Sequence, residues 1–230
     1  MKILIIAAHP DDIEPQMGAT IYQFTSSGHD VTMMTLILPE DDNKGNKIDG
    51  SKQRRRKEME KSAKILSARP VIFDEDRETF SIDPRARTRI IEKIYKDYRP
   101  DIVFTCCEDD SHSDHAIVYR AVLGATRDNS SDLYLFQPVI PGNLYPQRFR
   151  ANAFSHFSQH VMDKKLESIR CYVSQMEKSP RYNEENWIGA TMARDKMYGG
   201  QLGTEYAEAF QMLRGKLHIN GNYSQSGYFL

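Results

Sequence analysis

The sequence predicts an α/β protein with a Rossmann-like, three-layer fold, in which a mainly parallel sheet carries helices on both faces. Short apolar runs alternate with helical segments of about 10 to 15 residues, as in repeated βαβ units. The runs are continuous rather than alternating with polar residues, which indicates strands buried on both faces. The 230 residues suit one such domain, so we expect a single domain over 1–230, with 215–230 as a candidate tail.

The first part of the chain predicts two strand-helix pairs. The apolar run 3–8 predicts a buried strand, which Pro10 ends because proline lacks the N–H that a strand donates. Apolar residues at helical spacing, with Gly28 as their stop, predict a helix after it. The run 31–38 predicts the second strand, and 53–66 the second helix.

The next segment begins with a loop and continues the alternation. Residues 40–51 are polar with two glycines, which predicts a mobile loop; we leave open whether it is a lid or a plain solvated connection. A short third strand is expected at 71–73. Ile90, Ile94 and Tyr98 mark a helix that ends before Pro100, and 102–106 predicts a fourth strand.

The second half of the chain is less regular. We expect a helix that turns Ile117, Ala121, Val122 and Ala125 inward, with Ser111 or Ser113 as its N-cap. A fifth strand is expected at 133–139. Apolar residues from 162 to 176, spaced by four and three, predict one amphipathic helix.

The C-terminal segment gives weaker signals. Gly199-Gly200 predicts a turn, and 206–213 fits either a helix or a strand.

Composition narrows the class of function. With 31 Lys and Arg against 32 Asp and Glu, the formal charge is −1, which gives no electrostatic reason to expect nucleic acid or an anionic membrane as a partner. The three cysteines make no disulfide framework, and no apolar stretch approaches the roughly 20 residues of a spanning helix. We therefore expect a reduced, cytoplasmic setting without membrane insertion, and we leave open whether the chain forms homo-oligomers.

Two polar clusters follow predicted strands, His9-Pro10-Asp11-Asp12 after the first and His112-Ser113-Asp114-His115 after the fourth. The carboxyl ends of parallel strands share one edge of a sheet, which is where ligands bind in such folds. Either cluster alone is more typical of a turn or a helix start. Two of them at one edge favour a metal site, because two imidazoles and a carboxylate around Zn²⁺ leave a position open for catalysis.

At these residues the sequence resembles the PIG-L/LmbE-like metal-dependent de-N-acetylases. The resemblance rests on motifs in the same order along nearly the whole chain: Ala8-His9-Pro10-Asp11-Asp12-Ile13-Glu14, Gly18-Ala19-Thr20, Arg55-Arg56-Lys57-Glu58, Asp110-x-His112-x-Asp114-His115, Ser174-Gln175 and Tyr206-Ala207-Glu208-Ala209-Phe210. It implies hydrolysis of an acetamide on an amino sugar, typically N-acetylglucosamine in a small-molecule conjugate.

The resemblance also implies roles. The zinc ligands would be His9, Asp12 and His115; Zn²⁺ is expected, and whether Fe²⁺ or another divalent metal is loaded in the cell is left open. Asp11 would be the base that activates the water bound to the metal and returns its proton to the departing amine.

Three further residues receive roles in the same way. Protonated His112 would stabilise the oxyanion, and Asp114 would orient a histidine. Arg55 would contact the substrate through a sugar hydroxyl or phosphate.

The chain departs from the family's usual pattern at three places. Gly18-Ala19 stands where Gly-Gly is common, Pro15 follows Glu14, and Tyr172 stands where a His usually precedes Ser-Gln. These departures leave the implied metal ligands unchanged and bear on substrate choice.

Two other classes are compatible with parts of the sequence. A site with two His and one carboxylate also occurs in non-haem Fe(II) oxygenases, although many of these are all-β proteins, unlike the alternating pattern here. Dependence on oxygen and 2-oxoglutarate would identify that class. The third reading is a non-catalytic Rossmann-like binding domain, but no Gly-x-Gly-x-x-Gly follows the first strand.

Overall fold

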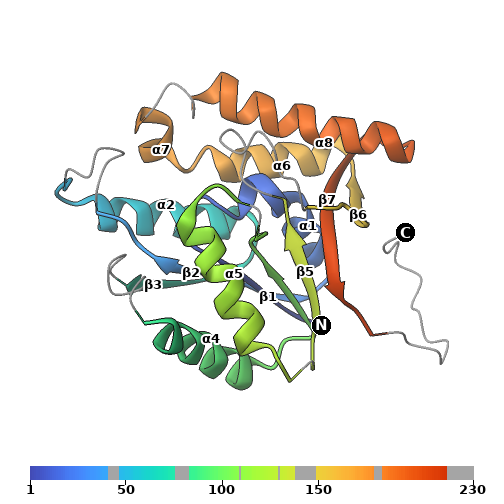
Figure 1. The fold of residues 1–230 in the computed structure, drawn as a ribbon. Helices are drawn as coiled ribbons and strands as arrows, with labels where there is room; N and C mark the ends of the chain where they lie inside the picture. Colours follow the sequence, from blue (N-terminus) through green and yellow to red (C-terminus); the bar gives the residue numbers. More distant parts are fainter. Residues whose placement is uncertain are drawn as a thin grey trace.

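The computed structural model describes residues 1–40, 47–75, 83–108, 110–128, 130–137, 149–178 and 183–216. Its seven-stranded sheet has the order β3-β2-β1-β4-β5-β7-β6 (Figure 1). The strands are β1 (Lys2–Ala7), β2 (Asp30–Ile37), β3 (Arg69–Glu75), β4 (Ile102–Thr105), β5 (Asp132–Phe136), β6 (Ala153–Phe157) and β7 (Tyr206–Arg214). The helices are α1 (Glu14–Ser26), α2 (Ser51–Ile65), α4 (Pro84–Tyr98), α5 (Ser113–Ala125), α6 (Gln159–Ile169), α7 (Val173–Lys178), the π-helix η2 (Glu184–Ile188) and α8 (Gly189–Leu202).

Helices cover the sheet on both faces, as predicted. Helices α4 and α5 pack together on one face, and α1, α2 and α6 pack together on the other (Figure 1). The expectation of a mainly parallel sheet is only partly right. Strands β1 to β5 are parallel, whereas β7 runs antiparallel to both β5 and β6, so the sheet is mixed.

The strand order reverses direction between β1 and β4. From β1 the chain builds β2 and β3 on one side, and from β4 it builds β5 on the other. Such a reversal leaves a crevice at the carboxyl ends of the two central strands. The register pairs Ile6 with Thr105, so the loops that follow β1 and β4 leave the sheet side by side.

Several sequence-based expectations differ from the structure. Strand β6 was not predicted, and the single helix expected at 162–176 is divided into α6 and α7, with Val173 exposed at 44%. The segment 206–213 is a strand. Residue 137 of the predicted fifth strand lies outside β5. The rest of that prediction, 138–139, falls outside the described residues, as do 41–46 of the polar loop and 217–230 of the candidate tail.

The turn predicted at Gly199-Gly200 is wrong, because both glycines lie inside α8. A Cβ on Gly199 would lie 2.6 Å from the Cα and N of Tyr206. Glycine therefore serves here to let α8 pack against the backbone of β7, rather than to turn the chain.

Helix α1 begins directly after the first polar cluster and is interrupted at once. Met17 has non-helical dihedral angles (φ −148°, ψ 21°), so the helix starts again after it. The N–H groups of Ala19 and Thr20 donate to the Glu208 carboxylate on β7, at 3.0 and 2.8 Å. A carboxylate at this position satisfies donors that a helix start leaves unpaired.

Glu208 belongs to a fully buried network of charges. Lys165 of α6 lies 2.7 Å from Glu208 Oε1 and 2.5 Å from Asp195 Oδ2, and all three side chains are shielded from solvent. Arg194 pairs with Asp195 at 2.7 Å and also donates to Gln16 Oε1 of α1. The network joins α6, α8 and β7 to the first turns of α1.

No described helix is both long and apolar enough to cross a membrane.

Removing one member of this network should destabilise the fold. We expect Glu208→Gln to lower the free energy of unfolding by about 3 kcal/mol, because Lys165 would lose a buried partner. Equilibrium unfolding in urea measures the change. Glu60→Gln, an exposed site on α2, is the control and should change stability by less than about 0.5 kcal/mol. A Glu208→Gln protein as stable as the control would contradict this reading of the network.

Candidate metal centre

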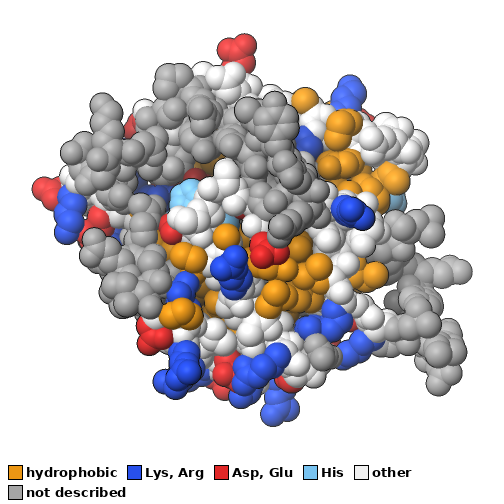
Figure 2. Space-filling model, in the orientation of Figure 1, with side chains coloured by type: hydrophobic (Ala, Val, Ile, Leu, Met, Phe, Trp, Pro, Cys, Tyr) orange, Lys and Arg blue, Asp and Glu red, His pale blue; other side chains and the backbone are white. Residues whose placement is uncertain are grey.

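The predicted metal ligands come together at the carboxyl ends of β1 and β4. His9 and Asp12 lie on the loop after β1, and His115 lies in the first turn of α5. All three are buried, and one possible ligand atom from each lies within 4.8 Å of the others. Histidine side chains are visible at the surface on the face shown in Figure 2.

His9 lies between two carboxylates, with Asp114 next to one ring nitrogen and Asp12 next to the other. Its Nε2 lies 3.0 Å from Asp114 Oδ2, while its Nδ1 lies 3.5 Å from Asp12 Oδ2. The same Asp12 oxygen accepts the backbone N–H of His9 at 2.7 Å. The shorter contact favours the ring proton on Nε2, which leaves the lone pair of Nδ1 facing Asp12. Asp114 therefore lies where the sequence expectation of an orienting carboxylate requires.

His115 is oriented in the same way by a residue to which the sequence assigned no role. Its Nδ1 lies 2.7 Å from Asp110 Oδ2. Its Nε2 is buried and makes no hydrogen bond with any described residue, although Asp12 Oδ1 lies 3.2 Å away. A buried polar nitrogen of this kind requires a partner, which a cation would supply. The available sequence signal for Asp110 was its place in the same short motif, five residues before His115.

The electrostatics of the centre favour positive charge. Burial alone would raise the pKa of Asp12, but His115 and His9 outweigh burial and hold that pKa well below its ordinary value. Burial would lower the pKa of His115, but Asp12 and Asp110 raise it well above its ordinary value. The pocket thus stabilises either a proton or a cation at this position.

His112 is exposed and caps α5, where the sequence suggested Ser111 or Ser113 instead. Its Nδ1 accepts the N–H of Asp114 at 3.2 Å, which assigns the ring proton to Nε2. Desolvation, and then His9 and His115, lower the pKa of His112 to about 4. The ring is therefore neutral at pH 7 until negative charge develops beside it, whereas the resemblance implied a protonated ring. The neutral ring still offers Nε2–H as a donor.

Asp11 and Arg55 form an ion pair next to the predicted ligands. Arg55 Nη2 donates to Asp11 Oδ1 at 2.8 Å and to the Pro10 carbonyl at 2.9 Å. Arg55 is only 5% exposed. Asp11 has φ +100°, a strained conformation that non-glycine residues adopt rarely and that persists only where the surrounding structure holds it. The guanidinium thus holds the backbone and the side chain of the loop together.

Tyr172, one of the departures from the family pattern, contacts Glu14 at the end of the same loop. It is fully buried, and its hydroxyl donates to Glu14 Oε1 at 2.6 Å, as does Ser62 at 2.5 Å. Burial raises the pKa of Glu14 to about 7. Tyrosine therefore supplies a neutral donor to a buried carboxyl group and leaves the candidate ligands untouched.

The donor set fits a divalent transition metal. Catalytic zinc sites typically combine imidazole nitrogens with a carboxylate oxygen as ligands. In such sites the second nitrogen of each imidazole is hydrogen-bonded to a group such as a carboxylate, as it is for His9 and His115 here. The same ligands also suit Fe²⁺, so the donors do not select one metal.

Several known proteins are similar to this chain along most of its length. Diacetylchitobiose deacetylase of Thermococcus kodakarensis is 28% identical over 235 residues, covering 95% of this chain and 85% of that protein. Among solved structures, 4-carboxy-2-hydroxymuconate hydratase GalB of Pseudomonas putida KT2440 has a TM-score of 0.77 at 21% identity, covering 95% of this chain and 98% of that one. N,N'-diacetylchitobiose deacetylase of Pyrococcus horikoshii has a TM-score of 0.74 at 21% identity, covering 92% and 83%. These structural likenesses show a shared fold.

The model of one protein family matches residues 4–126, more than half of the chain. The matched segment contains both polar clusters, and therefore every candidate ligand of the metal centre. The chain belongs to the PIG-L family, described as GlcNAc-PI de-N-acetylases.

Proposed function

We propose that this protein is a metal-dependent hydrolase that removes the N-acetyl group from an N-acetylated amino sugar of the N-acetylglucosamine type. The observation that carries the proposal is the convergence of His9, Asp12 and His115, with both imidazoles oriented by carboxylates. Membership of the PIG-L family and the similarity to diacetylchitobiose deacetylase support the choice of substrate.

In this proposal the ligands are His9, Asp12 and His115, and Zn²⁺ is the metal most typical of the donor set. When bound, the cation would polarise the amide carbonyl and make a water molecule a better nucleophile at neutral pH.

Asp11 is the proposed general base. It removes a proton from the attacking water and delivers it to the nitrogen of the departing amine, so that water and amide yield acetate and a free amine. Arg55 Nη2 lies 2.8 Å from Asp11 Oδ1. This ion pair helps to hold Asp11 in its uncommon backbone conformation.

The predicted contact between Arg55 and substrate stays a prediction. Its two hydrogen bonds to the loop, to Asp11 and to the Pro10 carbonyl, support a role in holding that loop.

His112 is the proposed oxyanion donor. Its Nδ1 is occupied by the N–H of Asp114, so Nε2–H is the group that remains to bind an oxygen anion. The negative charge that develops in the transition state would strengthen this hydrogen bond as the reaction proceeds.

Acetate release from N-acetylglucosamine conjugates tests the reaction and the role of Asp11 together. Wild-type protein loaded with Zn²⁺ should release acetate from at least one conjugate in such a screen. Asp11→Asn should keep the metal and lower kcat by about 100-fold or more, as expected for the loss of a general base. An Asp11→Asn protein with near-normal turnover would contradict the role of Asp11. Absence of acetate from every conjugate would contradict the proposed substrate.

Substitution of His115 tests the metal site without substrate. His115→Ala should lose the bound metal, because two ligands remain and Asp12 loses its buried partner. Elemental analysis after dialysis against a weak chelator measures the metal retained. His160→Ala, on α6, is a histidine control that should retain it. Equal metal content in both variants would remove His115 from the ligand set.

A further inference from the structure

Asp110 lies on the segment between β4 and α5, and its side chain is only 4% exposed. Its two oxygens contact two different histidines. Oδ2 lies 2.7 Å from His115 Nδ1, and Oδ1 accepts the backbone N–H of His112 at 2.9 Å. One carboxylate therefore joins the imidazole of a proposed metal ligand to the residue that carries the proposed oxyanion donor.

We propose that Asp110 is a positioning residue for the metal centre. It holds the proton of His115 on Nδ1, so that Nε2 faces Asp12 with its lone pair free for a cation. A carboxylate bonded to a metal-binding imidazole also makes that imidazole more basic, and loss of such a partner typically costs about 10- to 100-fold in metal affinity. The inference rests on the proposed function, because it takes His115 to be a metal ligand.

The arrangement around His9 supports this assignment independently. Asp114 contacts His9 Nε2 at 3.0 Å, as Asp110 contacts His115 Nδ1. The centre thus uses a carboxylate-imidazole pair twice, and each pair leaves the other ring nitrogen facing Asp12. Two such pairs around one carboxylate fix the orientation of both rings before a metal arrives.

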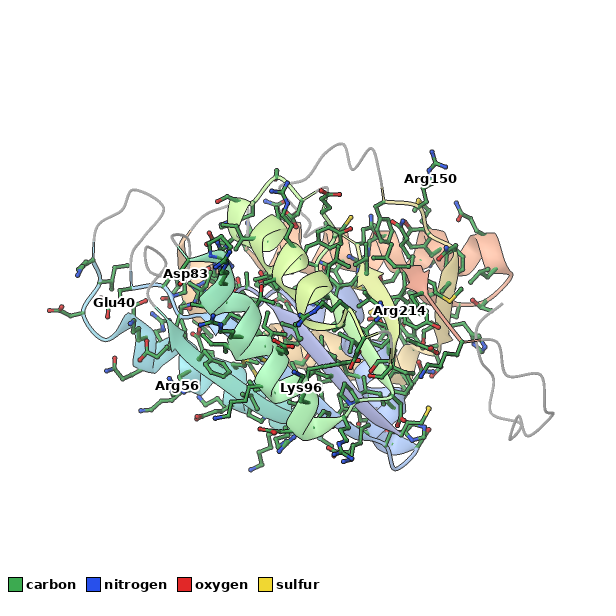
Figure 3. The ribbon with its side chains drawn as sticks, turned by 60° about the horizontal axis from the view of Figure 1, so that its bottom comes forward. Glu40, Arg56, Asp83, Lys96, Arg150 and Arg214 are labelled. Atoms are coloured by element: carbon green, nitrogen blue, oxygen red, sulfur yellow. The ribbon has the colours of Figure 1, made fainter. Side chains whose placement is uncertain are left out.

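A purely structural role for Asp110 would affect stability rather than metal affinity. If its only function were to accept the His112 N–H at the start of α5, its loss would lower stability without changing metal affinity. Asp83 provides a matched control, because it caps α4 by accepting the N–H groups of Arg85 and Ala86 at 2.8 and 3.1 Å (Figure 3).

The experiment measures the dissociation constant of Zn²⁺ by competition with a chromophoric chelator. The proteins are the wild type, Asp110→Asn, Asp110→Ala and Asp83→Ala, each checked for folding by circular dichroism. Asp110→Asn keeps an acceptor for the His112 N–H but removes the charge beside His115, and should weaken binding by about 10-fold. Asp110→Ala should weaken it by about 10- to 100-fold. Asp83→Ala should bind as the wild type does.

Substitution of Co²⁺ gives a spectroscopic readout of ligand geometry. The visible absorption bands of the Co²⁺ protein should change in both Asp110 variants and stay unchanged in Asp83→Ala. Should Asp110→Ala fail to fold, Asp110→Asn decides the question. Zn²⁺ affinity and Co²⁺ spectra equal to those of the wild type in the folded Asp110 variants would overturn the inference while leaving the proposed function intact. A wild-type protein that binds neither metal would overturn both.

Discussion

The whole centre depends on the register of β1 against β4. Pairing of Ile6 with Thr105 makes the two strands end together, and the strand order reverses between them. The two loops that follow are far apart in sequence, yet His9 and Asp12 from one meet His115 from the other. The apolar residues of β1 and β4 are buried on both faces of the sheet, so they anchor both strands in the core and hold the two loops at the same edge.

Buried polar groups hold the first loop from behind. Glu208 caps the second part of α1, Arg194 contacts the start of α1, and Tyr172 and Ser62 bind Glu14 just after Asp12. Burying such groups is costly unless their hydrogen bonds are made, so the segment has few alternative conformations. This restraint acts together with the hydrogen bonds of Arg55 to Asp11 and the Pro10 carbonyl in holding Asp11 at φ +100°. Three of these supporting residues, Tyr172, Arg194 and Glu208, lie in the C-terminal half of the chain, outside the segment that the family model matches, whereas Ser62 lies inside it.

Sequence reasoning found the strands up to β5, because continuous apolar runs and their proline or glycine ends are local signals. It also predicted that the two polar clusters lie at one edge of the sheet, since the carboxyl ends of parallel strands share an edge. It did not find β6 or the direction of β7, because these depend on pairing with distant strands rather than on local pattern. The glycines of α8 were misread as a turn because their purpose, close packing against Tyr206, is a tertiary contact. Asp110 received no role for the same reason: its partner nitrogen becomes apparent only in three dimensions.

The fold by itself does not choose the reaction, because chains of similar fold include both a hydratase and a deacetylase. What the account requires is one divalent cation held by two imidazoles and a carboxylate. X-ray absorption spectroscopy of the zinc-loaded protein tests this most directly. The account predicts a shell of nitrogen and oxygen ligands at about 2.0 to 2.2 Å, with the multiple-scattering pattern of two imidazoles. A sulfur ligand at about 2.3 Å, or the pattern of a single imidazole, would contradict it.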